Sequence, residues 1–298
     1  MGILKTQALD FSGVTKVRIS TDIASLTVKP SITPSLELMG VGLPTSYTLD
    51  VKNDAELLDI TMQIKNWVLG PLNMYELIIR LPDSFDGDID IASHTGAVNM
   101  AGFNLGNVSV ENSTGIVRLG IGAKTLHVQT STGAVEVDCE NRQLESLELK
   151  SNTGKIEAAN VQTKTAKCMV RTGSTALRNI HAEKIDIESG TGSVQLEECS
   201  GILRVSGGTG SVNADMTEMA ETSIHTNTGS IRLRIPDLPF TLEAATNTGR
   251  IRTDFKLYGE ITAGGGVRLG DEIRGTYNDG GTKVQLKTKT GSIDIDKQ

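Results

Sequence analysis

Apolar and polar residues alternate with a period of two along most of the chain, and a Thr-Gly dipeptide interrupts the alternation at regular intervals. The side chains four and six residues before each threonine, and three and five residues after it, are mostly apolar. Around Thr114, for example, Val108 and Val110 precede the dipeptide, and Val117 and Leu119 follow it. A period of two is typical of a β-strand with one buried face. Each copy therefore predicts a strand, a turn and a second strand.

The dipeptide recurs ten times in the same phase of the pattern. Its threonines are Thr95, Thr114, Thr132, Thr153, Thr172, Thr191, Thr209, Thr228, Thr248 and Thr290. Most steps are 18 to 21 residues long, and the last step of 42 residues is about two periods. Two short strands cannot bury their own apolar face, but stacked copies bury it along one axis. The sequence therefore predicts an all-β fold, a single-domain parallel β-solenoid with rungs of about 19 residues.

A β-sandwich of antiparallel hairpins is the alternative architecture. It requires tight two-residue turns such as Asn-Gly at every reversal, whereas Thr-Gly stays in one phase of a fixed repeat, which favours the solenoid. We expect Gly154 and its counterparts to adopt a positive φ angle, which glycine tolerates without strain. The neighbouring Ser, Thr and Asn side chains are expected to hydrogen-bond the backbone of the turns.

Both ends of the chain follow the pattern less regularly. Residues 1–85 predict degenerate rungs that cap the solenoid, and residues 86–298 predict its regular part within the same domain. In this interpretation Ile23 and Ala55 stand where the turn threonine stands elsewhere. The stretch "WVLGPLNM" (67–74) reads as an insertion. The stretch "GGGVRLGD" (264–271) reads as part of an irregular rung between residues 254 and 285.

The composition adds constraints on core, partners and location. Aromatic residues make up only 3% of the chain, so the core is expected to be aliphatic. A net charge of −7 disfavours a nucleic-acid partner, which requires a basic surface. No apolar run reaches the ~18 residues of a membrane-spanning helix, and the start "MGILKTQALDFSG" has no apolar leader segment, which predicts a cytoplasmic location. Three scattered cysteines, Cys139, Cys168 and Cys199, suit a reducing compartment and read as small buried residues.

Two segments near the C-terminus share a characteristic sequence pattern. They read "TSIHTNTGSIRLRIPDLPFTLEAATNTGRIRTDFKLYGEI" (222–261) and "TKVQLKTKTGSIDI" (282–295). These segments resemble the adhesin-like family of bacterial β-repeat proteins, a domain of unknown function, and the resemblance extends over about residues 10–296. It implies a β-solenoid without known catalysis, often associated with the bacterial cell envelope or its stress responses. It supplies no catalytic residues.

The outward positions of the predicted strands carry the candidate chemistry. Five residues before the turn, the series Glu148, Lys167, Asp186, Arg204 alternates in charge. We expect ion pairs between neighbouring rungs there, each worth about 0.5 kcal/mol. The four histidines occupy different phases, and no calcium-binding repeat or phosphate-binding loop is present. The sequence therefore predicts no metal site, no cofactor and no catalytic residue.

One outward feature departs from this alternation of charges. Arg232 and Arg252 occupy the same phase in consecutive Thr-Gly repeats, with Arg234 and Arg250 nearby, and these four residues are called the arginine cluster below. Like charges on adjacent rungs repel, and the pattern predicts no carboxylate partner in phase for these arginines. The cluster therefore predicts a binding site for a protein or an anionic cell-envelope component, because guanidinium groups bind carboxylate and phosphate. The alternative is neutralisation by acidic residues of the preceding or following corner, such as Asp237 or Asp254.

Two functions from different classes remain at this point. The first is a non-catalytic binding or scaffold protein. The second is a carbohydrate-active β-helix enzyme that uses an outer sheet face. An enzyme of this kind needs two or three carboxylates that converge in one groove, and a scaffold needs none.

Overall fold

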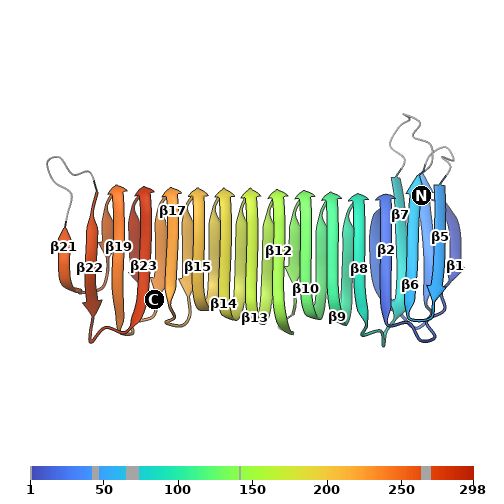
Figure 1. Cartoon of the computed structure of the whole chain (residues 1–298), viewed down its shortest axis with the longest axis horizontal. Coiled ribbons are helices and arrows are strands. Elements are labelled where there is room, and N and C mark those ends of the chain that lie inside the picture. The colour runs from blue at the N-terminus through green and yellow to red at the C-terminus, as the bar shows by residue number, and fades with distance from the viewer. Residues whose placement is uncertain (1, 42–46, 65–73, 141, 263–269) are drawn as a thin grey trace. The chain divides into compact units, whose positions relative to one another are not determined.

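A computed structural model describes residues 2–41, 47–64, 74–140, 142–262 and 270–298. These residues form β-strands joined by turns, and none of them is helical. The all-β prediction is therefore confirmed for this part of the chain. Two compact units are distinguished, Met1–Ser151 and Asn152–Gln298, and in each of them the strands run side by side (Figure 1). The division into a cap (1–85) and a regular part (86–298) stays a prediction.

The first unit is built from eleven strands and most of a twelfth. They are β1 (Gly2–Ala8), β2 (Lys16–Ile23), β3 (Ser25–Ser31), β4 (Ser35–Val41), β5 (Tyr47–Asp54), β6 (Leu57–Ile64), β7 (Met74–Pro82), β8 (Asp88–Thr95), β9 (Val98–Thr114), β10 (Val117–Thr132), β11 (Val135–Asp138) and β12 (Gln143–Thr153). β8, β9 and β10 are parallel neighbours, as the sequence pattern predicts.

Sequence order and spatial order differ at the start of this unit. β2 lies between β6 and β8, and β3 lies between β7 and β9, all in parallel register. Beyond them the pairing becomes antiparallel, because β5 pairs with β6, β4 with β7, and β1 with β4. The unit therefore ends in antiparallel strands, which do not continue the parallel stack.

The two proposed pseudo-turns in this unit have different outcomes. Ile23 lies opposite Thr95, so its assignment to the turn phase is confirmed. The assignment of Ala55 is wrong, because Ala55 lies in the turn of the antiparallel hairpin β5–β6, with a φ of 48°. Leu58 consequently lies opposite Val17, on the strand before the turn rather than after it. The predicted insertion at 67–74 lies outside the described residues apart from Met74.

The second unit contains the remaining strands. They are β13 (Ile156–Thr172), β14 (Thr175–Thr191), β15 (Val194–Thr209), β16 (Val212–Met216), β17 (Thr222–Thr228), β18 (Ile231–Ile235), β19 (Phe240–Thr248), β20 (Ile251–Thr253), β21 (Tyr258–Thr262), β22 (Glu272–Tyr277), β23 (Thr282–Thr290) and β24 (Ile293–Lys297). Ile156 faces Thr175, and Thr175 faces Val194, so the parallel neighbours are offset by 19 residues each time.

The last two strands of the chain lie inside the stack of this unit. β23 pairs in parallel with β17 on one side and β19 on the other, and β24 pairs in the same way with β18 and β20. β22 continues from β19 in antiparallel orientation, and β21 pairs with β22. The predicted irregular rung at 254–285 is thus partly an antiparallel ending, and most of "GGGVRLGD" lies outside the described residues.

Inward and outward positions follow the predicted alternation. Val194 and Val205 are only 1% and 3% exposed, whereas their neighbours Gln195 and Arg204 are exposed. Aliphatic side chains dominate the buried residues of both units. In the second unit, three aromatic rings from β19, β22 and the segment after β20 pack together; they are Phe240, Phe255 and Tyr277, with ring centroids 4.9 to 5.7 Å apart.

The Thr-Gly turns are joined from one repeat to the next. Gly154 has a φ of 147°, which confirms the expected positive angle. Two residues before the turn threonine, a buried polar side chain reaches the turn of the neighbouring repeat. The hydroxyl groups of Thr288 and Thr246 donate hydrogen bonds to the carbonyl oxygens of Gly229 (3.0 Å) and Gly291 (2.8 Å). Side chains near the turn do bond turn backbone, as expected, but these bonds cross between repeats.

Candidate functional site

The structure places the arginine cluster beside acidic residues of the last strand. Arg232 and Arg234 lie on β18 and Arg252 on β20, but β24 lies between these strands. Asp294 of β24 therefore faces both Arg232 and Arg252. The expectation that the two arginines occupy adjacent strands is wrong, because the C-terminal strand separates them.

Ion pairs neutralise most of the cluster. The closest nitrogen–oxygen distances are 3.1 Å for Arg232–Asp296, 3.7 Å for Arg252–Asp294 and 3.5 Å for Arg234–Asp215. The expected lack of a carboxylate in phase is therefore also wrong, and the partners lie on neighbouring strands rather than at corners.

The cluster nevertheless remains open to solvent. The side chains of Arg232 and Arg252 are 61% and 69% exposed. Arg250 is exposed and forms no ion pair within the described part of the chain. Binding of an anionic partner by these arginines stays a prediction.

The charged series five residues before the turn also differs from expectation. Lys167, Asp186 and Arg204 do face one another on β13, β14 and β15. Their side chains do not pair across these strands, however. Asp186 pairs with Lys184 of its own strand, and Arg204 lies 3.9 Å from Glu221. In the first unit one cross-strand pair of this series forms, between His127 and Glu148 at 3.0 Å.

This arrangement leaves a shallow hollow on the outer face of the second unit. We call it the serine hollow, because Ser206 and Ser223 stand where longer side chains stand on adjacent strands. Its lining residues are Lys167, Asp186, Ile187, Glu188, Arg204, Val205, Ser206, Ser223 and His225. The hollow has a volume of about 430 Å³, within the ~300–1,000 Å³ range of small-ligand sites.

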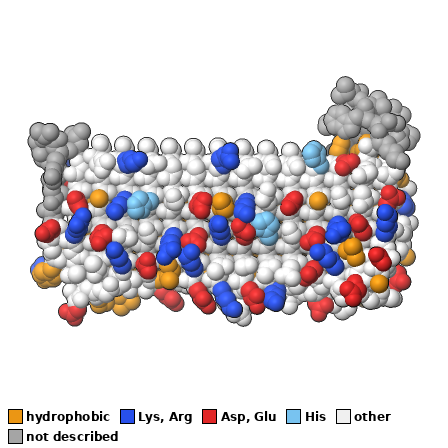
Figure 2. Space-filling view, viewed as in Figure 1, with side chains coloured by type: hydrophobic (Ala, Val, Ile, Leu, Met, Phe, Trp, Pro, Cys, Tyr) orange, Lys and Arg blue, Asp and Glu red, His pale blue; other side chains and the backbone are white. Residues whose placement is uncertain are grey.

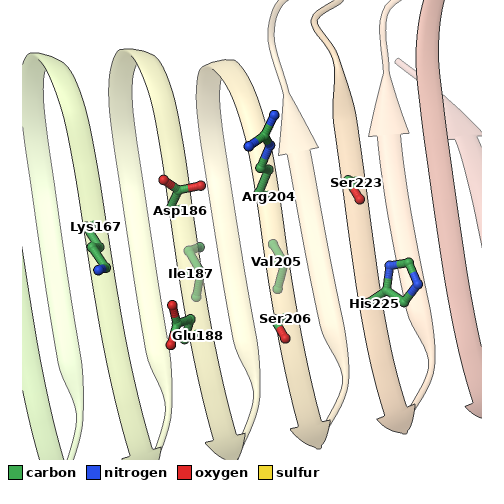
Figure 3. Close-up of a pocket in the computed structure, with 9 residues that line it drawn as sticks. All are labelled: Lys167, Asp186, Ile187, Glu188, Arg204, Val205, Ser206, Ser223 and His225. Carbon is green, nitrogen blue, oxygen red and sulfur yellow. The ribbon is translucent and has the colours of Figure 1, made fainter.

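Figure 3 shows two rows of side chains in the serine hollow. Lys167, Asp186, Arg204 and Ser223 form one row across β13, β14, β15 and β17, and Glu188, Ser206 and His225 form the second. The side chains of Ile187 and Val205 are buried in the core, so they add little apolar surface to the hollow.

Charges of both signs line the hollow, and two of the charged side chains, those of Lys167 and Glu188, form no ion pair with the described residues. Partial burial, and secondarily the positive charge of Lys287, hold the pKa of His225 below its ordinary value. His225 is therefore neutral near pH 7 and can both donate and accept hydrogen bonds.

The cysteines do not contribute to this surface. All three are buried and free, as predicted. Burial raises the pKa of Cys139 and Cys168 to about 12 and that of Cys199 to about 11. Since a thiolate is the reactive form, these thiols are poor nucleophiles at neutral pH.

Among the described residues, no group of three His, Cys, Asp or Glu side chains gathers in a way that would hold a metal ion. None of the described segments is a helix that could span a membrane. On the face shown in Figure 2, acidic and basic side chains are interspersed, without a large patch of one sign.

Sequence reasoning missed the serine hollow. The sequence pattern was compared only by charge along each row of outward residues, and side-chain length was not considered. The available signal was size, because Ser206 and Ser223 interrupt rows of long side chains at adjacent positions. Whether two short side chains leave a usable hollow depends on where their neighbours point, which the pattern does not specify.

Repeated strands that pair mostly in parallel, with an alternation of buried and exposed side chains, define a β-repeat protein. The profile of the Toastrack family, DUF4097, matches residues 116–296. This match covers more than half of the chain, and the chain belongs to the Toastrack family, which confirms the predicted relationship. Toastrack domains have a β-solenoid-like fold.

Three solved structures that match the chain share little sequence with it. A candidate cell adhesion protein from Clostridium sporogenes is 8% identical, with a TM-score of 0.24 and coverage of 99% of this chain and 98% of that chain. A candidate adhesin from Bacteroides fragilis is 11% identical, with a TM-score of 0.37 and coverage of 98% and 96%. A candidate lipid-binding protein from Parabacteroides distasonis is 11% identical, with a TM-score of 0.43 and coverage of 99% and 96%. No curated protein matches the chain.

Proposed function

We propose that the chain is a non-catalytic binding protein and that its partner binds the outer face of the second unit at the serine hollow. We further propose that the chain is one continuous parallel β-solenoid with rungs of about 19 residues. The offset of 19 residues between Ile156, Thr175 and Val194 supports this rung length. In such a fold the outer face is a rigid array of side chains, which suits binding without large rearrangement.

One observation carries the choice of the hollow. Within the hollow, Asp186 and Arg204 have an ion-pair partner. Lys167 and Glu188 have none among the described residues, and they line the same hollow as two small hydroxyl side chains, those of Ser206 and Ser223. Charged groups that the fold itself leaves without an ion pair, around a concave surface, are available to a ligand.

The arginine cluster is the second candidate surface. Arg250 supports it, since it is exposed and unpaired within the described residues. The aspartates of β24 weaken the attraction for an anion, because a partner must compete with ion pairs at 3.1 to 3.7 Å. The cluster therefore ranks below the serine hollow.

A carbohydrate-active enzyme is the alternative function. Glycosidases place two carboxyl groups on either side of the scissile bond. Asp186 and Glu188 lie on the same strand, two residues apart, and Asp186 is paired with Lys184. The far side of the hollow is formed by Ser223 and His225 of β17, without a carboxylate. This one-sided arrangement favours binding over hydrolysis.

The test compares Ser206→Arg with Ser211→Arg. Both serines are exposed, but only Ser206 lines the hollow, so the first variant fills the site and the second controls for the added arginine. Components of native cell extract that wild type retains should be lost from Ser206→Arg and kept by Ser211→Arg, at equal thermal stability. Equal retention by both variants would remove the hollow from consideration.

Two matched tests address the alternatives. The double variant Arg232→Gln with Arg252→Gln tests the arginine cluster in the same assay, and loss of retained extract components at equal stability would support it. Release of reducing sugar ends from polysaccharides by wild type would support the enzyme. The location of the protein stays a prediction: the sequence predicts the cytoplasm, and the family resemblance predicts an association with the cell envelope.

A further inference from the structure

The geometry of the serine hollow restricts the chemistry of its ligand, and this inference rests on the proposed binding function. Lys167 and Arg204 contribute positive charge, and Asp186 and Glu188 contribute negative charge. A polyanion would meet the two carboxylates, and a polycation would meet the lysine and the arginine. Since like charges in contact are unfavourable, a strongly charged chain of either sign is disfavoured.

Apolar ligands are disfavoured by the floor and walls of the hollow. Ile187 and Val205 are the two apolar residues of the lining, and their side chains point into the core, where they are buried. The remaining side chains end in hydroxyl, carboxylate, ammonium, guanidinium or imidazole groups. An apolar ligand would cover these groups without replacing their hydrogen bonds to water, which costs free energy.

A ligand rich in hydroxyl groups avoids both problems. Ser206, Ser223 and a neutral His225 each donate and accept hydrogen bonds, whereas Glu188 accepts and Arg204 donates. A hydroxyl group on the ligand can satisfy either kind of partner, because it donates one hydrogen bond and accepts two.

The spacing of the lining residues leaves room for a ring. Glu188 and His225 lie in the same row on β14 and β17, with β15 and its short Ser206 between them. Neighbouring strands are ~4.8 Å apart, so the two walls are separated by about 10 Å. This separation leaves room for one sugar ring over Ser206, whose side chain is short.

We infer that the serine hollow binds a short stretch of an uncharged glycan chain, with Glu188, Ser206, Ser223 and His225 as the contacting side chains. The hollow has no aromatic ring among its lining residues, so the stacking that strengthens many sugar sites is missing. A single site therefore binds weakly, with a Kd on the order of 1 mM. Tighter attachment requires several sites on one glycan.

The experiment uses the full chain and four hexasaccharides, and it follows backbone amide chemical shifts by NMR. Two probes are uncharged, the β-1,4-linked hexamers of glucose and of N-acetylglucosamine. The hexamer of glucosamine is cationic and differs from its uncharged counterpart only in the acetyl groups. The hexamer of galacturonic acid is anionic. Wild type should bind an uncharged hexamer, with shifts centred on Ser206 and Ser223, and should bind both charged hexamers at least about tenfold more weakly.

Variants separate this inference from the proposed function. Ser206→Arg should weaken binding of the uncharged hexamer at least about tenfold, and Ser211→Arg should leave it unchanged. No binding of either uncharged hexamer by wild type, equal binding by Ser206→Arg, or stronger binding of a charged hexamer would overturn the inference. If Ser206→Arg loses its partner from cell extract while no uncharged hexamer binds wild type, the glycan inference is wrong and the proposed binding site still stands.

Discussion

At the scale of single residues, two features require glycine at the turn: its backbone conformation and the close approach of the turn in the neighbouring repeat. Its positive φ could be predicted from the sequence, because the same phase holds glycine in ten repeats. The second reason could not be predicted, since it depends on how closely the repeats stack. A Cβ atom on Gly173 would lie 1.7 Å from the carbonyl oxygen of Gly154. The repeat therefore requires glycine for close approach as well as for conformation.

We expect Gly173→Ala to lower the free energy of unfolding by about 1–3 kcal/mol or more, because the methyl group strains the backbone and displaces the adjacent turn. Gly120→Ala is the matched control. A Cβ at Gly120 would meet nothing closer than 3.5 Å, so a change within about 0.5 kcal/mol is expected. Urea denaturation midpoints measure both variants. Equal midpoints would contradict the close stacking of the turns.

His225 gives the protein a pH-dependent term of predictable sign. Partial burial and Lys287 hold its folded pKa below the ordinary value of 6.5. The unfolded chain therefore binds more protons than the folded protein in the window below about pH 6.5, and this histidine's contribution to stability decreases as the pH falls through that window. We expect His225→Gln to make the stability less dependent on pH between about 5 and 7. Unfolding curves measured across this range give the slope of stability against pH for wild type, His225→Gln and the control His94→Gln. If His225→Gln has the same slope as wild type, the prediction is wrong.

At the scale of strands, sequence periodicity predicts the position of each strand in the sequence and its buried face, but not the order of the strands in space. Every repeat presents the same apolar face, so β23 fits between β17 and β19 as well as beyond them. Burial cannot discriminate between these orders. The discriminating signal is charge, because Asp294 occupies the same phase as Arg232 and Arg252 and removes their mutual repulsion when it lies between them. The sequence contains this signal, but the assumption that strands stack in sequence order conceals it.

A pair of engineered disulfides tests the order of these strands. Ser223 and Gln285 face each other on β17 and β23, so Ser223→Cys with Gln285→Cys should form a disulfide under mild oxidation, since neighbouring Cα atoms fall within the ~4.4–6.8 Å that a disulfide spans.

The control pair is Ser223→Cys with Glu243→Cys, which would be adjacent if strands stacked in chain order. β23 separates β17 from β19, which places these Cα atoms about 10 Å apart and out of reach. The native cysteines are buried and do not compete. Peptide mapping distinguishes the two outcomes, and cross-linking of the second pair alone would contradict the inserted strand.

At the scale of the whole molecule, each unit ends in antiparallel strands that limit further stacking. In the first unit β1, β4 and β5 form this ending, and in the second unit β21 and β22 do. An open strand edge can recruit another chain, and proteins commonly blunt such edges with bulges and lysine. β1 carries both devices: the register shifts at Leu4, and the Lys5 ammonium donates a hydrogen bond to the carbonyl oxygen of Leu49 at 3.2 Å. The sequence predicted capping at this end, but it did not indicate which residue blunts the edge.

Lys5 is therefore expected to keep copies of the protein apart. Lys5→Leu removes the charge from β1, a strand that pairs with β4 alone among the described strands, and leaves Ile3 and Leu4 exposed beside it. We expect the variant to self-associate at least about tenfold more strongly than wild type through this edge. Lys29→Leu is the control. Lys29 is an exposed lysine on β3, which has parallel neighbours on both sides, whereas Lys5 is half-buried on β1. Light scattering over a concentration series measures the association of each variant. If Lys5→Leu keeps the oligomeric state of wild type, the bulge at Leu4 is sufficient to block the edge; if Lys29→Leu associates equally, added apolar surface rather than the strand edge is responsible.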